Sequence, residues 1–143
     1  MTFLVACNKQ AIFYKYAGTV ITRIDVSNAE THFYLGEYNN TYPQSYIKVT
    51  YHGIDAGMDG YLIFLPNRKV DVVGCYGLFE KVGNDTNLCI RDFIDNGFFM
   101  RWEDSINGKY NNIIRIANED NSYERKENLE GHSKVQAIYG DKK

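Results

Sequence analysis

The sequence predicts an all-β domain, an antiparallel barrel or sandwich of about eight strands with one short helix near residues 87–95. Aromatic residues are abundant, with 12 Tyr, 8 Phe and 1 Trp in 143 residues, and such side chains fit the pleated, half-buried surface of a sheet. Several stretches alternate apolar and polar residues between turn signals, which is typical of strands. No strand–helix alternation is visible, which argues against a parallel doubly wound sheet.

The first half of the chain supplies most of the predicted strands. Residues 11–26 read AIFYKYAGTVITRIDV, with Tyr14 and Tyr16 on one side and Gly18 marking a bulge or bend. The stretch Tyr61 to Leu65 is apolar on both faces, so we expect it to be a central strand, followed by a Pro-containing turn. The other strands predicted here are 31–38, 45–52 and 70–76.

The second half is predicted to begin with the helix. Asp85 or Thr86 provides a cap for its first backbone N–H groups, and residues 89, 90, 93 and 94 share one helical face. Asn107-Gly108 lies between FFMRWED and YNNIIRI, which predicts a hairpin because both turn positions accept positive φ. Residues 118–134 are polar and hold either a short helix at 123–129 or a loop. VQAIY, residues 135–139, is predicted to be the last strand.

The charge, the apolar runs and the length of the chain limit the classes of protein to which it can belong. The net charge is −2 and the pI about 5.9, with no basic block, so we expect no nucleic-acid partner. No apolar run is long enough for a membrane-spanning helix. The length fits one domain. We therefore expect a single β domain over residues 11–143, preceded by a signal remnant or tether over residues 1–10.

The stretch Leu4-Val5-Ala6-Cys7 resembles the lipobox of bacterial lipoproteins. That motif has an aliphatic residue three positions before the cysteine and a small residue at the cleavage position. The resemblance implies lipid attachment at Cys7, a membrane anchor through that lipid, and a periplasmic or outer-membrane-anchored location. Cys75 and Cys89 would then remain as an even pair in an oxidising compartment, where we expect them to form a disulfide.

A second interpretation of the first residues stays open. Only Met1-Thr2-Phe3 precede the box, whereas a signal peptide needs a basic segment and an apolar segment there. If Met1 is the true start, FLVAC is a short first strand with a buried Cys. We then expect a cytoplasmic protein whose three thiols are reduced.

The stretch YLIFLPNRKVDVVG, residues 61–74, looks like the hairpins of lipocalin-like bacterial lipoproteins. This similarity implies a small β domain, in keeping with the alternating strands around it. It adds a family resemblance to the predicted barrel or sandwich.

Motifs for catalysis are absent from the sequence. GxSxG, HExxH and a phosphate-binding loop do not occur, and three widely spaced cysteines do not form a zinc motif. We predict no catalytic residues, no metal site and no cofactor. His32 and His52 are expected on neighbouring strands, which leaves three interpretations open: surface or core histidines, a metal pair, or an acid–base pair. The aromatic residues offered as a binding surface are Tyr34, Tyr38, Tyr46, Tyr51, Tyr61 and Trp102.

These observations support three functional hypotheses. The first is a non-enzymatic cell-envelope lipoprotein that binds another protein, of the immunity or inhibitor type. The second is a lipoprotein that binds a small ligand or a glycan in a tyrosine-lined pocket. The third is a hydrolase that uses histidine and carboxylate residues within hydrogen-bond reach in a cleft.

Overall fold

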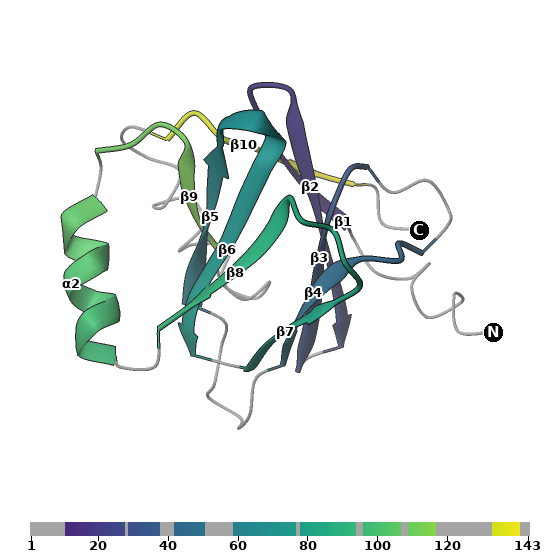
Figure 1. Ribbon diagram of the computed structural model, residues 1–143. Helices are drawn as coiled ribbons and strands as arrows, with labels where there is room; N and C mark the ends of the chain where they lie inside the picture. Colours follow the sequence, from purple (N-terminus) through teal and green to yellow (C-terminus); the bar gives the residue numbers. More distant parts are fainter. Residues whose placement is uncertain are drawn as a thin grey trace.

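A computed structural model describes residues 11–27, 29–37, 42–50, 59–76, 78–93, 96–106, 109–116 and 133–140. These residues form ten strands in two sheets and one helix (Figure 1). The sheets are open and lie against each other, so the arrangement is that of a sandwich. The predicted all-β class is therefore confirmed. The residues expected to form a signal remnant or tether, 1–10, lie outside the described part.

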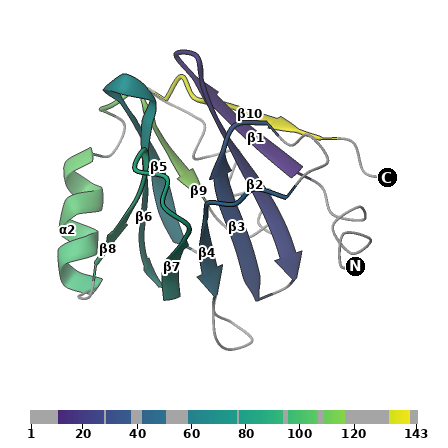
Figure 2. The ribbon, with the colours of Figure 1, turned by 45° about the vertical axis from the view of Figure 1, so that its right-hand side comes forward.

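The larger sheet has six strands and is antiparallel throughout. Its spatial order is β10-β1-β2-β3-β4-β7, which Figure 2 shows from one side. The strands are β1 (Ala11–Tyr16), β2 (Thr19–Ser27), β3 (Glu30–Leu35), β4 (Tyr46–Thr50), β7 (Leu78–Val82) and β10 (Gln136–Tyr139). Strands β1 to β4 are neighbours both in sequence and in space, because short connections favour such meanders.

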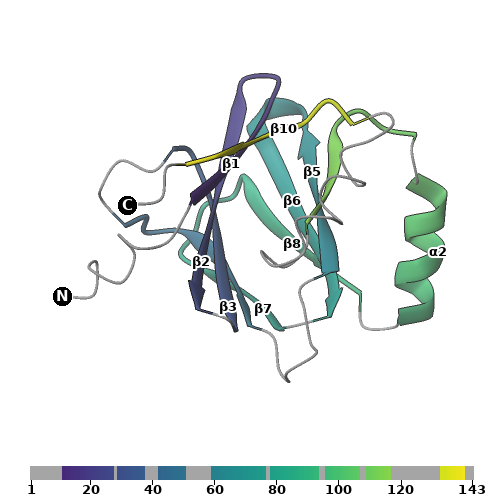
Figure 3. The same ribbon diagram turned by 180° about the vertical axis from the view of Figure 1, so that it is seen from behind.

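The smaller sheet has four strands in the order β8-β6-β5-β9. They are β5 (Asp59–Leu65), β6 (Lys69–Tyr76), β8 (Leu88–Asp92) and β9 (Ile113–Ile116). Strand β5 has a partner on each side, which confirms its predicted central place. The pairing of β6 with β8 is parallel. The sheet is therefore mixed, whereas the prediction was of antiparallel strands. Figure 3 shows both sheets from behind.

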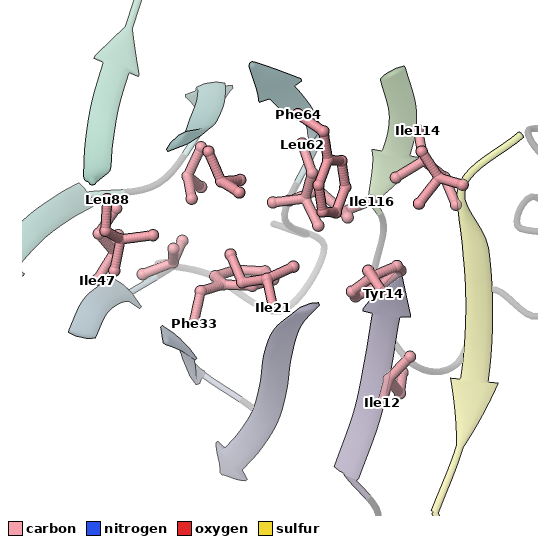
Figure 4. Packing of buried hydrophobic residues seen from close by; sticks show 14 of the residues in the cluster. Ile12, Tyr14, Ile21, Phe33, Ile47, Leu62, Phe64, Leu88, Ile114 and Ile116 are labelled. Carbon is pink, nitrogen blue, oxygen red and sulfur yellow. The ribbon is translucent and has the colours of Figure 1, made fainter. Parts of the chain in front are cut away.

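The core lies between the facing sides of the two sheets (Figure 4). Along β1 the alternation predicted from the sequence is observed, since Ile12 and Tyr14 are buried at 2% and 1% exposure and belong to the core. Across the interface, Leu62 and Phe64 of β5 point back toward them. Because the strand period is two, each strand buries alternate residues at this interface.

The predicted helix at 87–95 is wrong. Residues 88–92 form β8. Leu88 and Ile90 pack against the core, while Cys89 between them belongs to the other face of the strand. In so short a stretch, the apolar residues fit the spacing of a helix and the alternation of a strand equally well. The pairing with β6, which is distant in the sequence, selects the strand. Asp85 does accept a backbone hydrogen bond, from Asn87 N–H at 2.9 Å, but it closes a turn that leads into a strand.

The helix is instead α2 (Asn96–Ile106), a stretch predicted to be the first strand of a hairpin. Phe99 is buried with 1% exposure, and it stacks with Trp102 at 6.0 Å between ring centroids. These two residues and Ile106 are three and four positions apart, which places them on one helical face. Figure 1 shows α2 against the outer side of the smaller sheet. Asn107 and Gly108 lie outside the described residues.

Two tight turns lie together at one end of the sandwich (Figure 1). The β1–β2 hairpin turns at Ala17 and Gly18, which have φ of 48° and 81°, as a two-residue hairpin turn of the primed type requires. The β5–β6 hairpin turns over Pro66–Arg68 (η1), as the sequence predicts, and Asn67 and Arg68 have φ of 64° and 60°.

Candidate binding groove

Two adjoining hollows lie at the hairpin end of the sandwich. One, of about 410 Å³, is lined by residues of both hairpins, including Tyr16, Phe64 and Arg68. The other, of about 520 Å³, lies between the β1–β2 hairpin and the start of β10. The hollows share Tyr16, Ala17 and Thr19. We call them together the hairpin-end groove.

The floor of the groove is aromatic and fixed in place. The rings of Tyr16 and Phe64 are 5.9 Å apart between centroids. The Tyr16 hydroxyl donates to Asn111 Oδ1 at 2.9 Å, and the Asn112 side-chain amide donates to the Phe64 carbonyl at 2.8 Å. Because the residues before β9 hold both aromatic residues, this floor is organised before any ligand arrives.

The charged side chains that line the groove within the described residues are all cations. Lys15 and Lys134 line the larger hollow and Arg68 lines the smaller one, and among the described residues neither hollow is lined by Asp or Glu. Lys15 forms an exposed ion pair with Glu37 at 2.8 Å. The groove is therefore locally positive although the whole chain has a net charge of −2.

A second cluster of polar groups surrounds His32, on the face of β3 opposite to the core residue Phe33. The His32 Nε2–H donates to Glu30 Oε2 at 2.5 Å, and Nδ1 accepts from the Tyr42 hydroxyl, in the tautomer that satisfies both partners. The ring also stacks on Tyr46, 4.5 Å away between centroids. Lys48 lies directly opposite His32 on β4.

Burial decides the charge state of this histidine. Desolvation lowers the pKa of His32, hydrogen bonding to Glu30 raises it, and Lys48 lowers it, with a net shift below the usual value. The imidazole is therefore neutral near pH 7, with both nitrogens already engaged. A carboxylate, an imidazole and a half-exposed phenol are the parts of a proton relay, but His32 lines neither hollow of the groove.

A third cluster lies between α2 and the smaller sheet. The Tyr61 ring meets Trp102 edge-on at 5.3 Å, and its hydroxyl donates to Glu103 Oε2 at 2.5 Å. The Arg91 guanidinium lies over the Trp102 ring at 5.7 Å. These contacts hold the helix on the sheet, because aromatic and cation–π pairs add to the area that they bury.

The aromatic residues predicted as a binding surface fall into two groups. Tyr34 is buried at 3% exposure and, like half-buried Tyr46, belongs to the larger sheet. Tyr61 and Trp102 belong to the cluster at α2, on the other side of the sandwich. Tyr38 and Tyr51 lie outside the described residues. The structure thus brings Tyr61 and Trp102 together and places Tyr34 and Tyr46 in the other sheet, so the four described residues do not form one surface.

The predicted disulfide between Cys75 and Cys89 is absent, since Cys89 is free and half-buried. In the parallel pairing of β6 with β8, Cys89 lies opposite Asp71. Cys75 is four positions further along β6 than Asp71, roughly 13 Å in the strand direction. Two cysteines need Cα atoms within about 7 Å to be joined. Cys7, the predicted site of lipid attachment, lies outside the described residues, as does His52.

Sequence analysis did not select Arg68, Lys134 or Tyr16 as binding residues. The signal for Arg68 is the turn itself, because a Pro-Asn-Arg turn between two apolar strands places the residues after Pro at the tip of a hairpin. The proximity of Lys134 to that hairpin end depends on the pairing of β10 with β1. That long-range pairing cannot be read from local pattern.

Comparison with known proteins gives no match to a family model, a curated protein or a solved structure. Among the described residues, no group of three or more His, Cys, Asp or Glu is placed to hold a metal ion. The same part of the chain contains no helix of the length and apolar character that crossing a bilayer requires.

Proposed function

We propose that this protein is a non-enzymatic binding protein that recognises another protein through the hairpin-end groove. The observation that supports this is the groove's composition, an aromatic floor beneath cationic side chains, on two hairpins held by a packed sandwich. Binding residues are often placed on turns that a rigid scaffold positions. Recognition by such a groove needs no movement of the sheets and no catalytic group.

The cellular setting is part of the proposal. The lipobox-like stretch ending at Cys7 supports a cell-envelope lipoprotein, anchored through its lipid and acting as an immunity or inhibitor protein. The test is an intact mass of the protein from its native host, expressed with its upstream DNA. A chain that begins at Cys7 and carries acyl groups supports an envelope location. An unmodified chain that begins at Met1 overturns this part of the proposal.

Site-specific crosslinking tests the binding role. A photoreactive amino acid at Gln136, an exposed residue that lines the groove, is expected to crosslink one protein in the native host. The matched control is Lys81, an exposed residue on β7 at the opposite edge of the same sheet. Equal crosslinking from both positions, or none from Gln136, would contradict the proposed role.

A small ligand or glycan is the second candidate, and the smaller hollow favours it. Its volume of about 410 Å³ lies within the range of roughly 300–1,000 Å³ typical of ligand sites. Tyr16 offers a half-buried ring there, and Asn67 offers an amide. Amide chemical-shift changes at residues 64, 65, 67 and 68 on adding oligosaccharides, without a protein crosslink from Gln136, would favour this candidate.

The hydrolase hypothesis is supported by one arrangement, the hydrogen-bonded series Glu30–His32–Tyr42. If it is catalytic, Tyr42→Phe abolishes hydrolysis of model esters while the protein stays folded. If wild type and Tyr42→Phe give the same background rate, the series is structural, and we expect this result.

A further inference from the structure

We propose that the segment bound in the hairpin-end groove is an extended acidic stretch of the partner protein. This inference rests on the proposed function and specifies the chemistry of the partner. It starts from the three cations Lys15, Arg68 and Lys134, which line the groove together with polar and aromatic groups, while no carboxylate of the described part of the chain lines it.

The charge balance within the groove favours an anionic partner. Within the described residues, Arg68 and Lys134 form no ion pair. Lys15 does pair with Glu37, but the two side chains are 37% and 59% exposed, and such a pair exchanges readily with a competing carboxylate. The groove therefore presents positive charge that the described part of the chain does not balance.

The backbone at Arg68 gives independent support. Its φ of 60° lies in the left-handed region, where an L side chain is strained and glycine is not. A long cationic side chain is nevertheless present at the hairpin tip, next to Asn67, which has φ of 64°. Strained positions of this kind are concentrated at binding sites. Contact between the guanidinium and a ligand would explain why a strained position at this tip carries an arginine.

The shape of the groove favours an extended peptide over a compact ligand. The two hollows continue past the β1–β2 turn because they share Tyr16, Ala17 and Thr19. One segment lying over this turn reaches Arg68 in the smaller hollow and Lys134 in the larger one. Carboxylates spaced along such a segment can pair with both cations, and its apolar groups can contact the Tyr16 ring.

A nucleic acid is disfavoured by the same counting. Phosphate polymers bind mainly through many lysine and arginine contacts along the backbone, and the groove offers three cations on a chain of net charge −2. An acidic peptide needs fewer contacts, because Arg and carboxylate form directional, charge-assisted pairs. Nucleic acid and anionic lipid are therefore treated as outcomes of the test.

The test is a titration of the full chain with a fluorescein-labelled oligoglutamate peptide, with oligoglutamine as the uncharged control. We expect oligoglutamate to bind and to shift the backbone amides of residues 15–20 and 67–69, more weakly at high ionic strength. Binding equal to that of oligoglutamine overturns the inference. So does tighter binding of single-stranded oligothymidylate, or of phosphatidylglycerol vesicles, at these same residues.

The matched variants remove equal charge at two places. The double variant Arg68→Gln/Lys134→Gln is expected to weaken oligoglutamate binding by about fivefold or more, as loss of two exposed charge pairs predicts. The control, Arg101→Gln/Lys81→Gln, removes two exposed cations from α2 and β7 and is expected to change binding less than about twofold. Equal weakening in both variants would show that net charge alone is responsible and would overturn the inference.

Failure of this inference is distinguishable from failure of the proposed function. A protein crosslinked from Gln136 whose yield is unchanged in Arg68→Gln/Lys134→Gln would keep the binding role and overturn the acidic segment. Absence of any crosslinked protein would count against the binding role itself, whatever the peptide titration gives.

Discussion

Arg23 and Arg68 carry the same guanidinium group in opposite environments. Arg23, on β2, has no exposed surface, whereas Arg68 is exposed at the tip of a hairpin. The Arg23 Nε donates to Asp25 Oδ1 at 2.9 Å, and its Nη1 donates to the Tyr14 hydroxyl at 3.4 Å. Arg68 forms no ion pair within the described residues. The cation with partners in its own chain serves the fold, and the cation without an ion pair in the described part of the chain is available to a ligand.

The electrostatics of the interior follow from burial. Desolvation by itself lowers the pKa of Arg23, but Tyr14 and Asp25 raise it, and the net direction is upward. The Thr31 hydroxyl also donates to Asp25 Oδ1, at 2.7 Å. The carboxylate is thus held by two side chains while it neutralises the guanidinium. Such a pair adds little net stability, yet losing one partner leaves an uncompensated buried charge.

The largest effect is therefore expected from Asp25→Asn, which removes the counter-charge of Arg23 but preserves the size of the side chain. We expect the free energy of unfolding to fall by about 3–5 kcal/mol, measured by urea denaturation. The control is Glu37→Gln, which breaks the exposed pair with Lys15 and is expected to cost less than about 1 kcal/mol. Similar losses in both variants would contradict the distinction between interior and groove.

The next largest effect concerns the backbone and compares a glycine inside a sheet with a glycine in a turn at the groove. Gly60 of β5 lies against β6 so closely that an added Cβ would collide with the Val73 carbonyl, a backbone atom. Gly60→Ala is expected to cost roughly 1–3 kcal/mol, measured as a shift in the urea midpoint. Gly18 at the groove has open space and φ of 81°, which Asn adopts more readily than most residues. Gly18→Asn is thus expected to cost less than about 1 kcal/mol.

If Gly60→Ala leaves the midpoint unchanged, β5 and β6 are not packed as closely as the pairing indicates. If Gly18→Asn costs as much as Gly60→Ala, space rather than backbone conformation restricts the turn. Either result would remove the contrast between a strand limited by packing and a turn limited by φ.

A smaller effect is expected from pH at His32. Its pKa is lowered in the folded protein, mainly by burial, with Glu30, Tyr42, Tyr46 and Lys48 around it. The unfolded chain therefore binds a proton more readily, so stability is fully present above the unfolded pKa of about 6.5 and is lost as pH falls below it.

The measurement is the free energy of unfolding at pH 7.5 and pH 5.5. Wild type is expected to lose more stability between these values than His32→Gln, because glutamine does not titrate. Titrating groups that do not contact His32 contribute equally to both proteins, and the comparison cancels them. An equal or larger loss in His32→Gln would show that His32 does not disfavour its protonated form when folded.

The sequence predicted the fold class because alternation is a local property. Tyr14 and Ile12 point into the core as the period of two requires, and β5 is central as its apolar faces indicated. The prediction failed between residues 88 and 106, where a strand was predicted to be a helix and a helix was predicted to be a strand. The reason for this failure is different. Leu88 and Ile90 fit either structure, and only the parallel pairing with β6 selects the strand.

The candidate site was less predictable than the fold. The aromatic residues singled out from composition lie mostly in packed clusters, as the contacts of Tyr61 with Trp102 show. The groove instead depends on two hairpin tips and the start of β10 meeting at one end of the sandwich. Their proximity results from sheet topology, which no local pattern of residues 15–20 or 66–69 contains.

The smallest effect on stability is expected from the substitutions with the largest effect on binding. Arg68→Gln and Lys134→Gln remove exposed cations without a partner in the described structure, so each is expected to change the free energy of unfolding by less than about 0.5 kcal/mol. Urea denaturation of the double variant, beside Asp25→Asn, measures this difference directly. A loss above about 1 kcal/mol would mean that these cations support the fold, as Arg23 does, and the groove would lose its charge available for a partner. An unchanged stability together with weakened peptide binding would separate the role of Arg68 from that of Arg23.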